Sequence, residues 1–217
     1  MFPRWCIGCG REGYFFCPSC IELLAPVMPP VCPRCGRPQG SARLCPGCRN
    51  WDAKIDGIRA PFRFEGVARD AVHQLKYNRL RILAPELAQL MTEHLAGYPV
   101  PGNVLVPVPL HPKRLRERGY NQSGLLAREL GRRLKLPLNE TCLVRQRDTS
   151  PQVGATLAER RANVAGAFRC RDFSLQGKGV ILVDDVVTTG ATLDACAAAL
   201  KAAAVVSVWG LTFAREI

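Results

Sequence analysis

The sequence predicts an α/β protein in which a small cysteine-rich domain precedes a mostly parallel sheet. Eight cysteines form four C-x-x-C pairs before residue 49, and the next cysteine is Cys142. Beyond Trp51, short apolar runs alternate with stretches of helical periodicity. This alternation is typical of a parallel sheet with helices on both faces. We therefore expect two domains, residues 1–50 and residues 51–217.

The composition limits the surroundings and the partners of the chain. Its formal net charge is +12, from 30 Lys and Arg against 18 Asp and Glu. The first residues, MFPRWC, lack the apolar core of a secretory signal. No apolar run approaches the roughly 18 residues that a membrane span needs. The sequence therefore predicts a basic, cytoplasmic protein with no membrane span.

The paired cysteines have the spacing of structural zinc sites. Four thiolates hold Zn²⁺ tetrahedrally, and C-x-x-C lets one tight turn direct two sulfurs at one ion. The segments CIGCGREGYFFCPSC and CPRCGRPQGSARLCPGC form an internal repeat, which predicts two sequential sites; an interleaved pairing is the alternative. Disulfides are disfavoured in a cytoplasmic protein. The first site would use Cys6, Cys9, Cys17 and Cys20, and the second Cys32, Cys35, Cys45 and Cys48.

The expected strands and helices of the second domain follow from hydrophobic periodicity. We expect strands at residues 58–64, 104–108, 138–144, 180–183 and 205–213. We expect helices at residues 66–77, 83–95, 122–136 and 193–205. Ser123 is the expected N-cap of the helix at 122–136, because serine accepts a hydrogen bond from the first turn.

The segment VILVDDVVTTGAT, residues 180–192, joins an expected strand to an expected helix through two carboxylates and three threonines. Backbone N–H groups at a helix N-terminus, together with threonine hydroxyls, can surround a phosphate. One capping residue explains one threonine but not the whole run. The chain contains no G-x-x-x-x-G-K-[ST] and no D-x-D, which argues against a P-loop or a haloacid-dehalogenase site.

All thirteen residues of this segment resemble the motif of type I phosphoribosyltransferases that binds phosphoribosyl pyrophosphate (PRPP). The resemblance implies that Asp184 and Asp185 contact the ribose hydroxyls and that Mg²⁺ bridges ribose and pyrophosphate. It also implies that the loop binds the 5′-phosphate through Thr188, Thr189, Gly190, Ala191 and Thr192.

Basic residues gather between residues 101 and 171, with 14 Lys and Arg against 5 Asp and Glu. By the same resemblance, the turn at 109–114 would face pyrophosphate, with Arg114, Arg116 and Arg118 as candidate contacts. His111 in that turn is better interpreted as a solvated or capping group. The stretch at 145–168 would form a flexible lid. A solvated basic face is the alternative interpretation of each arginine.

The double cysteine repeat, followed by VPVPL, RGYNQ, TSPQ, ERRANV and ILVDDVVTTGATL, resembles the ComF family of bacteria. That family is associated with competence, DNA uptake and the use of external DNA. The resemblance implies a type I phosphoribosyltransferase-like domain, two structural Zn²⁺, Mg²⁺ with PRPP or another 5-phosphoribosyl ligand, and other competence proteins as partners.

Two functions of different classes agree with these observations. In the first, the protein is an enzyme that transfers ribose 5-phosphate from PRPP to an acceptor that the motifs do not identify. In the second, it is a non-catalytic competence factor that binds nucleic acid. There, PRPP or a nucleotide would act as a regulator, and the arginines would follow the backbone of single-stranded DNA.

Overall fold

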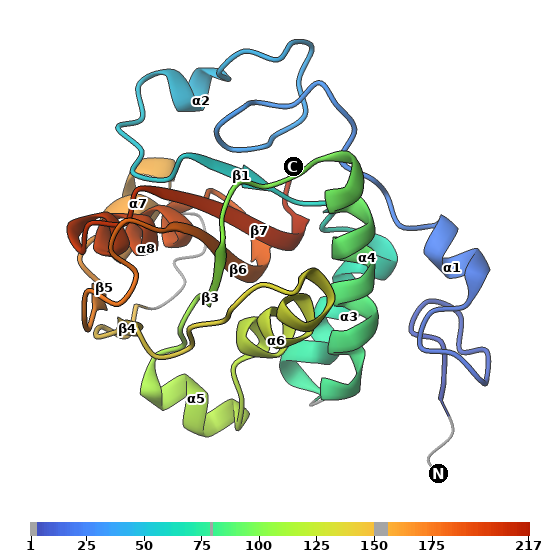
Figure 1. Cartoon of the computed structure of the whole chain (residues 1–217). Coiled ribbons are helices and arrows are strands. Elements are labelled where there is room, and N and C mark those ends of the chain that lie inside the picture. The colour runs from blue at the N-terminus through green and yellow to red at the C-terminus, as the bar shows by residue number, and fades with distance from the viewer. Residues whose placement is uncertain (1–3, 79, 150–155) are drawn as a thin grey trace.

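The computed structural model describes residues 4–78, 80–149 and 156–217, and its centre is a five-stranded sheet (Figure 1). The strand order is β1 (Gly57–Arg59), β7 (Ser207–Arg215), β6 (Gly179–Val187) and β3 (Val104–Pro107). Strand β2 (Phe62–Arg63) also pairs with β7. Every pairing in this sheet is parallel. The carboxyl ends of the strands therefore meet at one edge, where open α/β sheets bind ligands.

Alternating side chains along the strands divide the core between the two faces of the sheet. Ile181 and Val183 belong to the core that contains helices α3 (Gly66–Tyr77), α4 (Ala84–Gly97) and α6 (Gln122–Leu134). Val180 and Leu182 belong to the core of the other face, together with helix α8 (Ala191–Ala202). Helices cover both faces, so the predicted fold class is confirmed.

Smaller elements complete this part of the chain. The short helix η1 (Arg81–Leu83) leads into α4, and α5 (Pro112–Arg118) follows β3. Strands β4 (Leu143–Arg145) and β5 (Phe168–Cys170) form a separate antiparallel pair. Helix α7 (Leu157–Val164) begins with a capping box, in which Thr156 and Glu159 bond each other's backbone N–H. None of the described helices combines the length and the apolar character that crossing a membrane requires.

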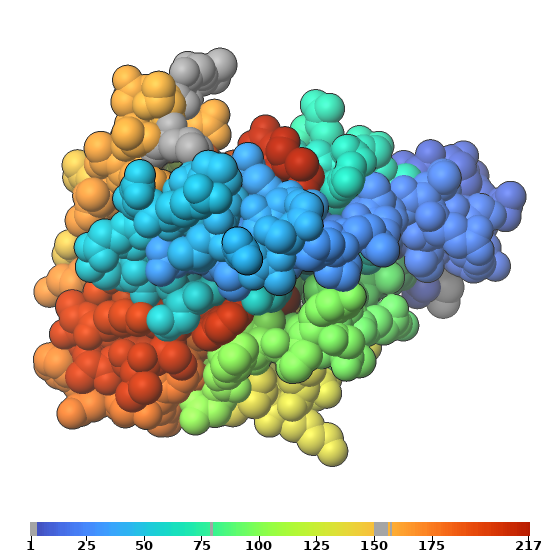
Figure 2. All heavy atoms as spheres, turned by 90° about the horizontal axis from the view of Figure 1, so that it is seen from above, coloured from blue at the N-terminus to red at the C-terminus, as the bar shows by residue number. Residues whose placement is uncertain are grey.

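The cysteine-rich segment lies as one band across the surface of the sheet domain (Figure 2). Its two short helices, α1 (Pro18–Glu22) and α2 (Pro46–Arg49), each follow an extended cysteine and begin with proline, which suits the first helical turn. The first repeat packs at one end of the band, beside α3 and α4. The second repeat lies over the carboxy-terminal strands. The boundary expected at residue 50 falls directly after α2.

Several elements lie where periodicity predicts them. Helix α3 has the expected bounds, and the other long helices and the main strands differ from expectation by a few residues. The main departure is β6, which continues through Val187 instead of ending at Val183. Its ladder with β7 continues past the carboxylates, pairing Asp184 with Thr212 and Val186 with Ala214. The two carboxylates therefore lie within a strand, not in a loop.

Local hydrogen bonds explain the first two of three further departures. Asn121, not Ser123, caps α6, because the Asn121 side chain accepts the Ser123 N–H at 3.1 Å. The strand expected at 138–144 begins only at Leu143. Before it, the Asn139 side chain accepts the N–H groups of Thr141 and Cys142 and holds a turn. The turn expected at 109–114 runs into α5.

The lid expected at 145–168 is described only in part. Its beginning is β4, and its end contains α7 and β5. Residues 150–155, which include part of the motif TSPQ, lie outside the described residues. The lid therefore stays a prediction.

Candidate functional site

Two adjacent carboxylates, Asp184 and Asp185, stand near the carboxyl end of the central strand β6. Asp185 is only 2% exposed. It forms an ion pair with Lys76 and accepts a hydrogen bond from Gln122 Nε2 at 3.1 Å. Asp184 is half-buried and accepts a hydrogen bond from Ser123 Oγ at 2.7 Å. Side chains from α3 and α6 therefore hold both acids in place.

The pKa values of the two carboxyl groups are shifted in opposite directions. Burial and the negative charge of Asp185 raise the pKa of Asp184 to about 7. Burial alone would also raise the pKa of Asp185, but the Lys76 ammonium outweighs it and holds that pKa below its usual range. Asp185 is therefore the permanently charged member, and Asp184 can gain or lose a proton near neutral pH.

A chain of polar contacts extends from the acid pair to α5. Gln122, which donates to Asp185, accepts a hydrogen bond from Arg118 Nη1. The Arg118 guanidinium also lies 5.6 Å from the centre of the Tyr77 ring. The structure thus places Arg118 one side chain away from Asp185. Sequence reasoning missed Lys76 and Gln122; the only local signal was the run R-G-Y-N-Q-S, which ends at the start of α6.

The loop after β6 leads directly into the N-terminus of α8. Gly190 has φ +82° and begins α8, with the Thr189 hydroxyl accepting the Ala191 N–H at 3.3 Å. A side chain at Gly190 would meet Ile58 at 2.9 Å and Trp51 at 3.2 Å, so glycine is required there. Thr188 is exposed, while Thr192 is half-buried within α8. Backbone N–H groups in the first turn of a helix generally favour a negatively charged ligand.

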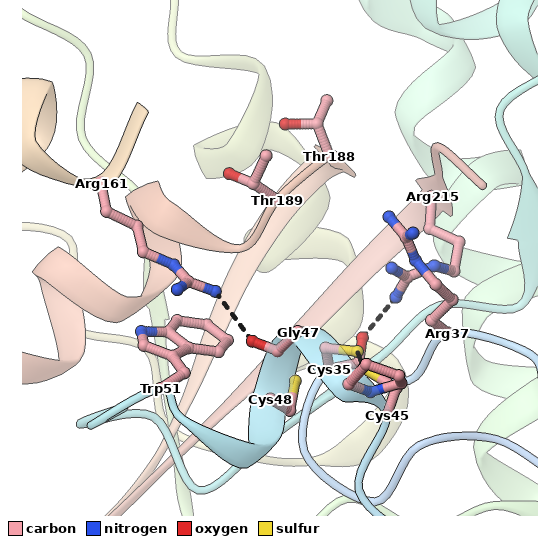
Figure 3. Close-up of a pocket in the computed structure, with 11 residues that line it drawn as sticks. Cys35, Arg37, Cys45, Gly47, Cys48, Trp51, Arg161, Thr188, Thr189 and Arg215 are labelled. Carbon is pink, nitrogen blue, oxygen red and sulfur yellow. Dashed lines mark hydrogen bonds between the residues drawn. The ribbon is translucent and has the colours of Figure 1, made fainter. Parts of the chain in front are cut away.

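A cavity of about 280 Å³ opens between this loop and the second cysteine repeat (Figure 3). Thr188 and Thr189 line it from the loop, and Arg161 and Trp51 stand on one side. The walls also include Cys35, Arg37, Cys45, Pro46, Gly47, Cys48 and Arg215. An adjoining cavity shares Arg37, Thr188 and Thr189 and adds Thr156, Arg160, Glu216 and Ile217. Sequence reasoning assigned no ligand role to these arginines.

The candidate pyrophosphate turn is already bonded within the protein. Arg114 donates from Nη2 to the Thr149 carbonyl at 3.1 Å, and its Nε lies 3.5 Å from the Asp148 carboxylate. His111 caps α5 by accepting the Lys113 N–H at 3.4 Å, which confirms its expected capping role. Arg116 is exposed on α5. Arg114 is therefore bonded to Asp148 and Thr149, whereas Arg118 lies beside Gln122 and Tyr77.

A larger cavity of about 900 Å³ lies beside this turn and reaches the β4 strand. Leu110, His111 and Arg145 line it. Arg145 is half-buried, donates to the Thr149 hydroxyl and lies 5.4 Å from the centre of the Phe168 ring. Burial, together with the nearby charge of Arg114, lowers the pKa of Arg145. Arg145 is a further cation at this edge that the sequence did not single out.

The eight amino-terminal cysteines form two clusters of four. The sulfur atoms within each cluster lie within 4.8 Å of one another, and the clusters are sequential, not interleaved. All cysteines are free of disulfides. In each cluster a backbone N–H donates to the first sulfur, Cys17 N to Cys6 Sγ at 3.4 Å and Cys45 N to Cys32 Sγ at 3.5 Å. Such bonds outweigh burial and lower the pKa values of Cys6 and Cys32 to about 6. This donor set fits Zn²⁺.

Two family models match the chain in the order that the fold shows. A double zinc ribbon domain matches residues 1–49, and a phosphoribosyl transferase domain matches residues 121–213. The chain therefore combines a double zinc ribbon with a domain of the type I phosphoribosyltransferase fold.

Relatives identify the family. The chain is 34% identical to the DNA utilization protein YhgH of Salmonella typhi over 190 residues, 83% of either chain. It is 32% identical to YhgH of Escherichia coli K12 with the same coverage. It is 31% identical to the competence protein ComFC of Bacillus subtilis, over 88% of this chain and 81% of that protein. The chain belongs to the ComF family.

Solved structures add a partial likeness. Glutamine PRPP amidotransferase from B. subtilis, complexed with ADP and GMP, matches with a TM-score of 0.37 and 20% identity. The match covers 60% of this chain and 25% of that enzyme.

Proposed function

We propose that this chain binds PRPP, with Mg²⁺, at the carboxyl edge of its sheet and transfers ribose 5-phosphate to an acceptor during the use of external DNA. The observation that carries this proposal is the acid pair Asp184–Asp185, held directly before an anion-binding turn at the N-terminus of α8. The names of the relatives, which refer to DNA utilization and competence, support the biological setting. We also propose one structural Zn²⁺ in each four-cysteine cluster, because the four sulfur atoms of each lie within 4.8 Å of one another.

Different side chains of this protein would bind different parts of PRPP. The turn at Thr188–Thr192 would bind the 5′-phosphate, and the two acids would orient the ribose through its hydroxyls. The oxygen donors at the acid pair suit Mg²⁺, and Asp184, which has no ion pair among the described residues, would hold it together with the ligand. When bound, Mg²⁺ would neutralise charge on the departing pyrophosphate.

The reaction would replace one bond at the anomeric carbon. The bond from ribose C1 to pyrophosphate breaks, the acceptor nucleophile forms the new bond to C1, and pyrophosphate leaves with its electron pair. The transition state resembles an oxocarbenium ion, which nearby negative charge stabilises. Asp185, charged and held by Lys76 and Gln122, would supply that charge. Arg114 and Arg118 would stabilise the leaving pyrophosphate.

The first experiment measures PRPP binding. PRPP with Mg²⁺ should raise the melting temperature, because binding to the folded state stabilises it by about 2.7 kcal/mol at a concentration one hundred times the Kd. Asp184→Asn combined with Asp185→Asn should abolish this rise. Asp70→Asn, which removes an exposed carboxylate from α3, is the matched control and should preserve it. An unchanged rise in the double variant would remove the ligand role of the acids.

Turnover is a separate question with its own assay. The protein, Mg²⁺ and labelled PRPP should be incubated with bases, nucleotides or single-stranded DNA, and pyrophosphate release measured. Release that depends on one acceptor class and is lost in the double variant would identify the reaction. PRPP binding without release for any acceptor would favour the second function, a nucleic-acid-binding factor regulated by PRPP. The 14 Lys and Arg against 5 Asp and Glu between residues 101 and 171 are the observation that supports this second function.

A further inference from the structure

The cavity between the second cysteine repeat and the Thr188–Thr189 turn contains three arginines from separate parts of the chain. Arg37 comes from the second repeat, Arg161 from α7 and Arg215 from the end of β7. Figure 3 shows Arg161 on one side of the cavity, Arg37 and Arg215 on the opposite side, and the two threonines above them. Three guanidinium groups thus face one space next to an anion-binding turn.

The burial of Arg215 makes this arrangement unusual. Arg215 is 1% exposed, and its Nη1 donates to the Cys35 carbonyl. Its Nε has no hydrogen-bond partner among the described residues. A buried guanidinium with an unsatisfied N–H is costly unless a ligand completes its bonding.

Arg161 repeats the pattern on the opposite side. Its guanidinium lies 4.1 Å from the centre of the Trp51 ring, and its Nη2 donates to the Gly47 carbonyl at 3.4 Å. Its Nε is buried and has no hydrogen-bond partner among the described residues. None of Arg37, Arg161 and Arg215 forms an ion pair within the part of the chain that the structure describes. Glu216, which follows Arg215 in the sequence, lines the adjoining cavity together with Arg37.

We propose that the second zinc ribbon forms one wall of the phosphate end of this ligand site, and that Arg37 and Arg161 bind a phosphate monoester in the cavity. A phosphate on the Thr188–Thr189 turn would be contacted by Arg161 and Arg37 from opposite sides, above the buried Arg215. The second ribbon would then contribute directly to ligand binding, whereas the first would not. This inference deepens the proposed function by assigning further residues to the phosphate end of its ligand, but phosphate binding here does not require turnover or Mg²⁺.

The internal repeat supplies a matched control for the experiment. Arg11 and Arg37 both follow the C-x-x-C-G of their repeats. Their carbonyls accept equivalent hydrogen bonds, from Cys6 N and Cys32 N, both at 2.8 Å, and both side chains are exposed. Only Arg37 lines the cavity. Arg11→Gln and Arg37→Gln therefore remove the same charge from equivalent turns.

The test uses the full zinc-loaded chain and inorganic phosphate, without PRPP or Mg²⁺, and measures affinity by calorimetry. Arg37→Gln and Arg161→Gln should each weaken phosphate binding by about tenfold, because each removes a charge-assisted hydrogen bond. Arg11→Gln should leave the affinity unchanged. Equal affinities in the wild type, Arg37→Gln and Arg161→Gln would overturn the proposal, as would equal losses in Arg11→Gln and Arg37→Gln. Unchanged melting curves without phosphate show that the variants remain folded.

Two further experiments distinguish this subsite from the proposed PRPP function and from binding of the DNA backbone. The variant carrying Asp184→Asn and Asp185→Asn should still bind inorganic phosphate, even if it no longer binds PRPP with Mg²⁺. Failure of the proposed function would therefore leave the subsite intact. Ribose 5-phosphate should displace inorganic phosphate, whereas single-stranded DNA without a terminal phosphate should not. Displacement by that DNA would assign the cavity to backbone phosphates and overturn the proposal of a monoester site.

Discussion

The two cysteine repeats have nearly the same local structure but very different surroundings. Gly10 N donates to the Cys6 carbonyl at 2.8 Å, and Gly36 N donates to the Cys32 carbonyl at 2.9 Å. Both glycines have positive φ, +73° and +72°. The first repeat packs against α3, where Gly8 lies close to Val67. The second repeat packs against β1, where Ile58 N donates to the Arg34 carbonyl at 2.7 Å.

This difference shows that the C-x-x-C-G spacing determines the local turn of each repeat, which we call its knuckle, but not the element against which that turn packs. The same turn packs on helix α3 in the first repeat, whereas in the second repeat it is hydrogen-bonded to a strand of the central sheet. Arg34 of the second repeat also donates to the carbonyls of Cys48 and Trp51, and Arg215 of β7 donates to the Cys35 carbonyl. The second repeat is therefore part of the same packed core as Val187 and Leu193, which flank the Thr188–Thr189 turn.

The largest expected effect comes from removing one cluster at a time. Cys6→Ser with Cys9→Ser and, separately, Cys32→Ser with Cys35→Ser should each reduce the bound zinc from two ions to one. Because binding of structural zinc contributes roughly 10 kcal/mol or more to folding, each should unfold its own ribbon. Only loss of the second cluster should also destabilise the sheet and abolish phosphate binding.

Zinc content, near-UV circular dichroism and limited proteolysis measure these outcomes. Residues 51–217 should remain protected from protease when the first cluster is lost. Equal damage to the sheet from both pairs of substitutions would remove the asymmetry between the ribbons. An iron–sulfur absorbance in the purified protein would contradict the zinc assignment itself.

A smaller effect is expected from the two knuckle glycines. A side chain at Gly36 would lie 2.4 Å from the Ile58 carbonyl, whereas one at Gly10 would meet nothing within 4 Å. Gly10→Ala should cost about 1–2 kcal/mol, from positive φ alone. Gly36→Ala should cost at least about 1 kcal/mol more, because the Ile58 carbonyl must also move. Urea denaturation measures both, and equal losses would show that the second knuckle is not held against β1.

The smallest expected effect concerns DNA. If α5 contacts single-stranded DNA, the triple change Arg114→Ala, Arg116→Ala and Arg118→Ala should reduce the slope of log K against log salt. The reduction should be about 0.7 for each phosphate contact that is lost. Arg11→Ala is a control on the first ribbon and should change nothing. If the triple variant keeps its slope and Arg11→Ala reduces it, the DNA surface lies on the ribbons. Absence of DNA binding at physiological salt would leave the DNA hypothesis without a direct contact.

Local features of this protein follow from its sequence alone. The internal repeat of C-x-x-C pairs predicted two sequential four-cysteine clusters, with interleaved pairing as the alternative, and the structure shows the sequential arrangement. The periodicity of residues 66–77 predicted α3, and the threonine-glycine run after residue 187 predicted the turn before α8. Each of these depends on interactions between neighbouring residues, which a sequence pattern displays directly.

Contacts between groups that are distant in the sequence depend on the tertiary structure. It brought Lys76 of α3 and Gln122 of α6 to Asp185, and it changed Ser123 from an expected cap into a hydrogen-bond donor to Asp184. It also placed Arg37, Arg161 and Arg215 around one cavity beside Thr188 and Thr189. Periodicity says which face of an element is buried but not which other element covers it. The sheet order and the docking of the second repeat, both set by long-range packing, therefore decide the composition of the site.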